Sequence, residues 1–237
     1  MGVPTPVLNT FGRIGAQIEL FRMHMKQRNR TELVPSALLS LLAATLIVGC
    51  GNPADGVQEA NVSAPSSGGP APVAVEGATA FTVNAESTID FTGSKITGSH
   101  SGGFSTFTGA IYVADGKIVA PSKIEIDMES TWSDSDRLTG HLTNSDFFDV
   151  PTFPTSSFAL TSIEETPEGH NVSGDLTLHG VTKNISFAAK VGVSDSLVTL
   201  SAEFFIKRYD FDIVFKGKPD DLIRDEVVIK LDIKADA

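Results

Sequence analysis

The sequence predicts an all-β protein whose strands form an antiparallel barrel. Apolar and polar residues alternate along several segments after residue 80, as they do in strands with one buried and one solvent-facing side. Turn signals such as Asp115-Gly116 separate these segments. The 21 glycines, with modest leucine and alanine after the N-terminal third, argue against a helical bundle. About eight or nine strands joined by short turns favour a closed barrel, because closing the sheet removes its exposed edge strands. A β-sandwich is the alternative.

The first segment, residues 1–49, is predicted to be a signal region. A basic stretch, Met25–Ser36, precedes the apolar run Ala37–Gly49, which is too short for a comfortable membrane span and is typical of a secretory signal. Residues 1–24 precede a conventional start, and we expect them to reflect a misassigned start codon. The mature protein is therefore expected to be exported.

The single cysteine, Cys50, follows Ile47–Gly49 and resembles the acylated residue of a bacterial lipobox. That resemblance implies an exported lipoprotein anchored by Cys50; a buried cysteine ending an apolar run is the alternative. Gly51 rather than aspartate follows, which by the enteric sorting rule favours the periplasmic face of the outer membrane. Cleavage leaves 13 basic and 27 acidic residues, a net charge of −14. Anionic head groups repel such a domain, so the acyl chain must hold it at the membrane.

Residues 50–78 are expected to comprise the lipidated cysteine and a flexible linker. The stretch Ser63–Pro72 is rich in Pro, Ala, Gly and Ser and lacks any hydrophobic period. The barrel domain is expected to span residues 79–237.

Within this domain the strands and one helix can be placed approximately. The clearest alternation predicts strands at Ile124–Met128, Ile185–Val191, Val198–Ile206 and Val227–Ile233. Weaker alternation predicts strands at Phe81–Ala85, Thr88–Thr92, Phe104–Val113, Ser157–Ile163 and Val172–Leu178. One short helix is predicted from Ser133 to about Asp146, beside or over a barrel end, with Ser133 or Asp134 as its N-cap and Leu138 and Leu142 on one face.

Several stretches resemble, in the same order, the YceI-like family of exported polyisoprenoid-binding proteins. They are Gly98–Gly109, Ile126–Ser130, Leu138–Leu142 with Asp146–Pro154, Gly174–Lys183, Arg208–Phe211 and Asp225–Ala235. The resemblance implies an extended lipocalin-like eight-stranded antiparallel barrel with one short helix. It also implies that an isoprenoid lipid, of quinone or polyprenyl type, is the partner bound inside the barrel.

The inward-facing side chains are the candidate lipid-binding residues. They are Phe91, Phe107, Ile124, Ile126, Met128, Phe158, Leu160, Leu176, Phe187, Leu200 and Phe204. An eight-stranded barrel is either filled by its own side chains or holds one slender ligand, and alternation alone does not separate the two. The aromatic motif Asp146–Pro154 has two interpretations: it seals the barrel under the helix, which we favour, or it is the gate through which a lipid enters. Gly174 and Gly180 indicate bends or a tight turn.

Composition and motifs exclude other classes of function. The chain has 237 residues and a net charge of −11, which disfavours binding to nucleic acid. One cysteine excludes a disulfide framework and a zinc site built on cysteine pairs. The mature chain has no pair of histidines at a metal-ligand spacing; its histidines are His100, His141, His170 and His179. No nucleophile elbow, Walker loop or dinucleotide motif is present.

Two classes of function remain. The first is a non-enzymatic lipid-binding module with no metal and no cofactor other than a bound isoprenoid lipid. The second is a structural or interaction lipoprotein whose barrel core is closed and whose acidic surface meets a protein partner.

Overall fold

The computed structural model describes residues 2, 51–66 and 76–237. Apart from Gly2, the expected signal region and the expected lipidation site Cys50 lie outside the described residues. The elements are β1 (Asn61–Ser63), β2 (Thr79–Val83), β3 (Thr88–Lys95), β4 (Gly98–Phe104), β5 (Phe107–Ala114), β6 (Lys117–Asp127), the 3₁₀ helix η1 (Met128–Ser130), β7 (Thr131–Ser133), α1 (Asp136–Leu142), β8 (Thr155–Thr166), β9 (Gly169–Leu178), β10 (Val181–Val193), β11 (Leu197–Lys207), the 3₁₀ helix η2 (Arg208–Phe211), β12 (Gly217–Lys218) and β13 (Asp221–Asp236).

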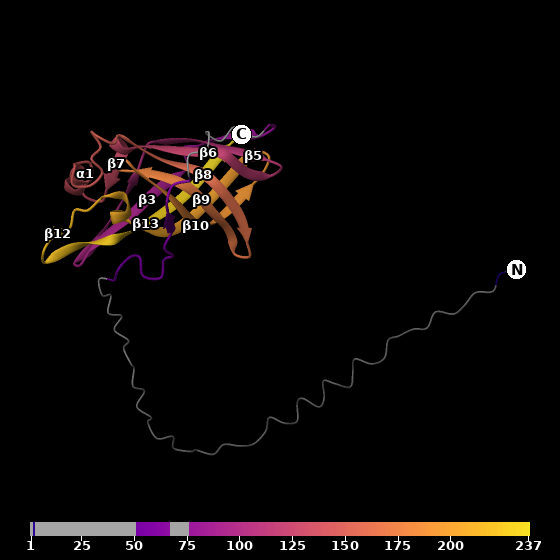
Figure 1. The fold of residues 1–237 in the computed structure, drawn as a ribbon. Helices are drawn as coiled ribbons and strands as arrows, with labels where there is room; N and C mark the ends of the chain where they lie inside the picture. The colour runs from indigo at the N-terminus through magenta and orange to yellow at the C-terminus, as the bar shows by residue number, and fades with distance from the viewer. Residues whose placement is uncertain (1, 3–50, 67–75) are drawn as a thin grey trace, which may run out of the picture. The chain divides into compact units, whose positions relative to one another are not determined.

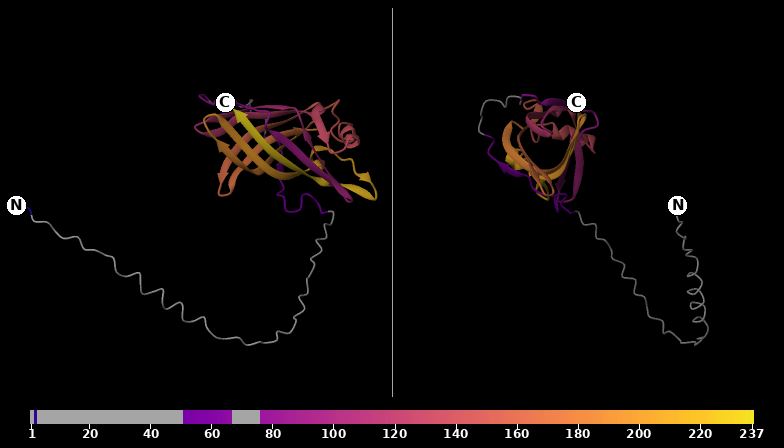
Figure 2. Two further views of the ribbon diagram at one scale, coloured as in Figure 1. Left: turned by 180° about the vertical axis from the view of Figure 1, so that it is seen from behind. Right: turned by 90° about the vertical axis from the view of Figure 1, so that its right-hand side faces the viewer.

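Eight of these strands close into a ring (Figures 1 and 2). Each pairs antiparallel with the next in the order β2, β5, β6, β8, β9, β10, β11 and β13, and β13 pairs back with β2. Beside β2, strand β3 also pairs with β13 and extends the sheet through β4 to β7. The predicted eight-stranded barrel is confirmed, and the sandwich alternative is wrong.

The alternation of side chains explains why the ring buries its inner face. On β10, Ile185 and Phe187 are buried, whereas Ala188 and Lys190 are exposed. The same pattern on the facing strands places their apolar residues in one continuous core. Burial of apolar surface therefore stabilises the closed ring, while the polar faces remain in water.

Helix α1 is shorter than the predicted helix. It begins at Asp136 because Ser133 belongs to β7 and pairs with Gly102 of β4. Ser135 is the N-cap residue, so the prediction that Ser133 or Asp134 caps the helix is wrong. After Leu142 the chain enters turns, in which the Phe147 amide donates to the Asn144 carbonyl.

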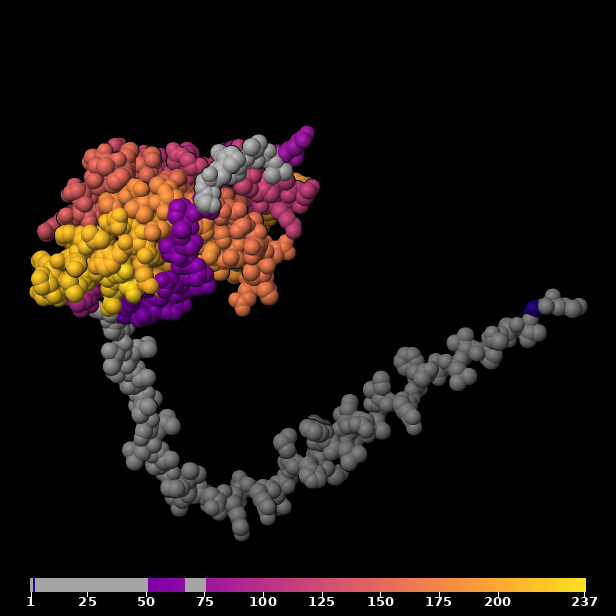
Figure 3. All heavy atoms as spheres, viewed as in Figure 1, coloured from indigo at the N-terminus to yellow at the C-terminus, as the bar shows by residue number. Residues whose placement is uncertain are grey.

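Residues 51–66 lie against the barrel, so the expectation of a flexible linker is wrong for this stretch. β1 pairs antiparallel with β10, with Asn61 opposite Ser186. One residue earlier, the Ala60 amide donates to the carbonyl of Phe205 on β11. The segment is therefore hydrogen-bonded to two neighbouring strands of the ring, and Figure 3 shows it lying across the barrel surface.

The position of this segment follows from the pairing of β10 with β11. These strands pair directly only between Lys190–Val193 and Val198–Ser201. Extending that register would place Ser186 opposite Phe205, but residues 58–63 lie between them instead. The N-terminal segment thus fills the gap between β10 and β11.

Two side-chain contacts hold the segment in place. Ala60 is only 1% exposed and belongs to the barrel core. Glu59 accepts from Lys207 at 2.7 Å, and this carboxylate raises the pKa of Lys207. A strand of three residues is too short to produce a detectable alternation, so sequence patterning could not reveal it.

We expect the Ala60→Glu substitution to lower the free energy of unfolding by more than about 2 kcal/mol, because the charge must be buried or the segment must leave the barrel. Thermal unfolding followed by circular dichroism measures the effect. Ala64→Glu introduces the same charge at an exposed position of the same segment and is expected to be nearly neutral. Equal stabilities of the two variants would show that the segment adds nothing to the fold.

Candidate functional site: an apolar cavity inside the barrel

An apolar cavity of about 230 Å³ lies inside the ring. Nine of the eleven candidate residues line it: Phe91, Ile124, Ile126, Phe158, Leu160, Leu176, Phe187, Leu200 and Phe204. Further lining residues come from β13, from α1 and from the turns that follow α1. The alternation of apolar and polar residues thus located most of the side chains that line the cavity. That these residues contact a lipid stays a prediction.

Met128 and Phe107 do not line the cavity. Met128 is 2% exposed, but β6 ends at Asp127 and Met128 begins η1, so the alternation of β6 no longer sets its direction. Phe107 is half-buried at the start of β5 and packs against the core. Both belong to the packed interior of the protein, outside the cavity wall.

Aromatic rings form two groups along the cavity. Phe187 stacks on Phe204, with ring centroids 4.2 Å apart and an interplanar angle of 13°, and Phe158 lies 5.8 Å from Phe187. Close to the turns after α1, Phe104 and Phe148 pack around Phe91 with centroid distances of 5.7 and 6.3 Å. Offset and tilted aromatic contacts of this kind stabilise a well-defined wall.

Gly174 makes room for one of these rings. A Cβ at this position would lie 2.2 Å from the Phe158 ring and 2.7 Å from the Ala159 carbonyl oxygen. The glycine therefore permits the close approach of Phe158, and it lies beside the register shift between Leu160 and Ser162 of β8. Gly180 does form the predicted tight turn, because it and His179 have positive φ angles of 73° and 52° between β9 and β10.

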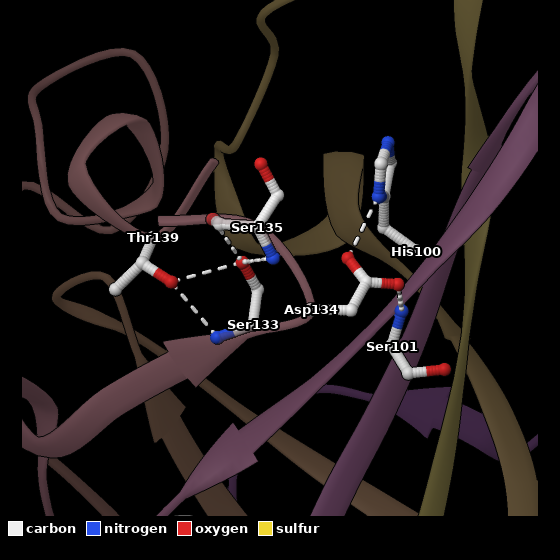
Figure 4. Close-up of polar contacts among 6 residues, drawn as sticks. All are labelled: His100, Ser101, Ser133, Asp134, Ser135 and Thr139. Carbon is white, nitrogen blue, oxygen red and sulfur yellow. Dashed lines mark hydrogen bonds and ion pairs between the residues drawn. The ribbon is translucent and has the colours of Figure 1, made fainter. Parts of the chain in front are cut away.

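Polar contacts join Asp134, which lies between β7 and α1, to β4, and join α1 to β7 (Figure 4). The two carboxylate oxygens of Asp134 bind His100 Nδ1 at 2.8 Å and the Ser101 amide at 3.0 Å. These contacts lower the pKa of Asp134, the hydrogen bond from the Ser101 amide contributing most. On the helix side, Thr139 Oγ1 lies 2.9 Å from the Ser133 hydroxyl and accepts from the Ser133 amide.

The motif Asp146–Pro154 packs at the same end of the barrel. Phe147 is 7% exposed and lines the cavity together with Phe148. Its ring contacts those of His141 and Phe215 at centroid distances of 4.9 and 5.4 Å. This packing agrees with the sealing interpretation, and a gating role stays a prediction.

The lining also contains six polar residues. The Ser122 hydroxyl donates to the Val119 carbonyl, the Ser156 hydroxyl donates to the Thr177 carbonyl, and Lys123 pairs with Glu125. The other three are Ser94, Arg208 and Arg224, which sequence reasoning missed as site residues.

A bulge explains why alternation could not find Arg224 and Ser94. The pairing of β13 with β3 is irregular between Ile223, opposite Lys95, and Val227, opposite Gly93. Arg224 and Ser94 lie inside this irregularity, where strict alternation does not hold, and both reach the cavity. Only Arg208 carried a sequence signal, as the first residue of the family-like stretch Arg208–Phe211.

The described ranges hold neither a metal-binding cluster nor a membrane-spanning helix. Residues 51–66 and 76–237 contain no group of three or more His, Cys, Asp or Glu side chains that could hold a metal ion. No helix within these ranges is long and apolar enough to cross a membrane.

Comparisons with known proteins identify relatives of this domain. The model of the YceI-like domain matches residues 81–235. A UPF0312 protein of Pseudomonas putida is 42% identical over 71 residues, which are 29% of this chain and 37% of that protein. Protein YceI of Escherichia coli is 32% identical over 120 residues, which are 47% of this chain and 62% of that protein. The matches therefore span less than two thirds of the length of either relative.

Two solved structures share the fold. BcnA of Burkholderia cenocepacia superposes with a TM-score of 0.58 and 23% identity, covering 65% of this chain and 99% of that one. A polyisoprenoid binding domain from Saccharophagus degradans superposes with a TM-score of 0.55 and 19% identity, covering 66% of this chain and 98% of that one. At these identities the likeness concerns the fold alone.

We expect acid to loosen the contact between Asp134, which precedes α1, and β4 before the barrel unfolds. The pKa of Asp134 lies below its ordinary value of 3.8, so the carboxylate stabilises the fold above about pH 4 and loses this contribution as the pH falls further. Trp132, the only tryptophan, lies on β7 near Asp134, and its fluorescence reports the change. Asp134→Asn should remove this acid-dependent step, whereas Asp195→Asn in a remote turn should keep it. An identical fluorescence profile for all three proteins would contradict the assignment.

We expect Gly174→Ala to lower the free energy of unfolding by about 1–3 kcal/mol, because the added methyl collides with Phe158 and with a backbone carbonyl. Gly140→Ala on α1 is the matched control. Nothing lies within 4 Å of its added Cβ, and alanine favours a helix by up to about 1 kcal/mol over glycine. Chemical denaturation measures both, and an unchanged midpoint for Gly174→Ala would refute the close approach.

Proposed function

The chain belongs to the YceI-like family, and on that premise we propose that its barrel binds the tail of an isoprenoid lipid, of quinone or polyprenyl type, without catalysing a reaction. The observation that carries the proposal is the apolar cavity enclosed by the ring. The structurally similar protein from Saccharophagus degradans is a polyisoprenoid binding domain, which supports the same ligand class here.

The energetics of the cavity suit a hydrocarbon tail. Moving an apolar chain from water into such a cavity contributes about 0.8 kcal/mol per buried methylene. A tail therefore needs no polar contact along its length, and the lining offers few. The two groups of aromatic rings, one around Phe91 and one around Phe187, supply large apolar surfaces along the cavity.

We further propose that the domain works at the periplasmic face of a bacterial membrane, more specifically the outer membrane. The support is the sequence of the signal region and of Cys50, whose acylation would anchor the chain. Dual acylation of such a residue gives stable membrane attachment without a spanning helix. In this arrangement the barrel receives lipid from the adjacent bilayer.

Replacing Leu200 by tryptophan tests the proposed binding. Leu200 is half-buried and lines the cavity, so the larger side chain should fill free space, reduce retained isoprenoid lipid and cost little stability. Retained lipid is measured by organic extraction and mass spectrometry of protein purified from its own membrane. Stability is measured by chemical denaturation of the same samples.

Met128→Trp is the matched control for this measurement. Met128 is 2% exposed in the packed core outside the cavity, so the same tryptophan should cost about 1–3 kcal/mol through overpacking. Strong destabilisation by Leu200→Trp, together with no lipid in the parent protein, would refute binding. That result would favour the alternative, a structural or interaction lipoprotein with a closed barrel core and a protein partner.

A further inference from the structure

Three of the five large hydrophobic side chains that are exposed in the described residues belong to neighbouring turns at one end of the barrel. They are Ile96, Val214 and Leu222, each between 44% and 58% exposed. The Ile96 amide in the β3–β4 turn donates to the Leu222 carbonyl at 3.2 Å. Val214 lies in the loop from η2 to β12, and β12 pairs with β13 at Leu222. We call the two stretches that carry these side chains, Lys95–Thr97 and Asp212–Arg224, the tip. Single exposed apolar side chains are common, whereas a gathered group indicates a partner.

The tip also forms part of the cavity wall. Ile213 and Ile223 adjoin Val214 and Leu222 in the sequence, but both of them line the cavity. Successive side chains of an extended chain point to opposite sides, so one residue faces the interior and the next faces out. The exposed apolar side chains of the tip therefore lie only one chain thickness from the cavity.

The N-terminal segment meets the barrel at the same end. Figures 1 and 2 show the start of the purple segment beneath the end that carries β12. Glu59 in this segment pairs with Lys207, the residue before η2, and η2 leads directly into the tip. Cys50, the proposed anchor, immediately precedes the described stretch 51–66. An acylated Cys50 would therefore hold the tip toward the membrane.

The tip differs in charge from the rest of the mature chain. It carries four basic and three acidic residues, a formal charge of +1, whereas the remainder of the mature chain has 9 basic and 24 acidic residues, a charge of −15. Lys216 and Lys218 of the tip are exposed and form no ion pair within the described ranges. Anionic head groups repel the acidic remainder and attract these lysines, so charge favours contact through the tip.

We propose that the tip docks onto a lipid bilayer that contains anionic lipid. Ile96, Val214 and Leu222 insert among the head groups, which removes their apolar surface from water. Lys216 and Lys218 contact the lipid phosphates. This inference rests on the proposed membrane location and adds the face that the barrel presents to the bilayer. The cavity wall next to the tip then faces the bilayer as well.

The test measures which end of the acylated protein contacts the bilayer. The protein is purified from its own membrane and reconstituted in vesicles of phosphatidylethanolamine and phosphatidylglycerol. Cys50 is the only cysteine and acylation uses its thiol, so Leu222→Cys provides a single site for an environment-sensitive fluorophore. We expect the emission to shift to shorter wavelengths and to be quenched by lipids that are brominated on their acyl chains.

Asp195→Cys is the matched control at the opposite end of the barrel. β10 begins next to η2, because Nδ1 of His179 in the preceding turn lies 3.1 Å from the Phe211 carbonyl oxygen. From there β10 runs from Val181 to Val193, and the turn that follows contains Asp195. Asp195 is exposed, as Leu222 is, so the same fluorophore can be attached. It should show neither the shift nor the quenching.

The apolar contacts are tested in the Leu222→Cys protein. Ile96→Ser together with Val214→Ser should abolish the quenching, because the remaining apolar surface of the tip is too small to insert. Both side chains are exposed, so the fold is expected to be retained, and circular dichroism checks this.

The electrostatic contacts are tested in the same labelled protein. Lys216→Gln together with Lys218→Gln should lower the ratio of docked to undocked protein by up to about fivefold for each lysine. Lys190→Gln together with Lys230→Gln removes two exposed lysines from β10 and β13 and should leave the quenching unchanged.

The outcomes separate docking of the tip from attachment by the anchor. Equal quenching of the two fluorophores, or none in vesicles that contain the protein, would overturn docking through the tip while leaving membrane attachment intact. Quenching that survives the serine or the tip glutamine substitutions would also overturn it. A wavelength shift in detergent that grows with protein concentration would show that a second copy covers the tip. A Cys50 thiol that reacts with the fluorophore in the parent protein would overturn the proposed anchor itself.

Discussion

Closure of the hydrogen-bonded ring is the constraint on which the cavity depends. β13 supplies the longest part of that closure, because one edge pairs with β11 from Leu197 to Lys207 and the other edge pairs with β3 and β2. Where both edges of a strand are paired, its backbone amides and carbonyls need no partner from the interior. The inner faces can therefore present side chains alone, and the cavity that they enclose is almost entirely apolar.

The pairing is also irregular between β5 and β6 and between β8 and β9, but the bulge in β13 is the irregularity that gives the cavity a polar end. Between Ile223 and Val227 the strand loses its register with β3, and the carbonyls of Ile223 and Arg224 accept from Arg208. The guanidinium group thus satisfies backbone groups that the irregular pairing leaves free. A cation is buried as a consequence, so the feature that interrupts the sheet also sets the electrostatics of that end.

Sequence patterning predicted the parts of the molecule that depend on strict alternation. The barrel class and nine of the candidate side chains followed from it, because a closed sheet with one dry face repeats every second residue. It failed where the period breaks. Met128 lies in a 3₁₀ turn, Ser94 and Arg224 lie beside a bulge, and β1 is too short to show a period. These positions are determined by pairing between distant segments, which a single sequence does not display.

The N-terminal segment connects the proposed anchor directly to the cavity wall. Its hydrogen bonds go to Phe205, between Phe204 and Ile206, both of which line the cavity. Only residues 51–57 separate Cys50 from the hydrogen-bonded stretch, and Ala54 among them is itself 7% exposed. A chain extends by at most about 3.6 Å per residue, so an acylated Cys50 would hold the barrel near the membrane surface. A lipid tail leaving the bilayer would then have a short path to the barrel, which a long flexible linker would not ensure.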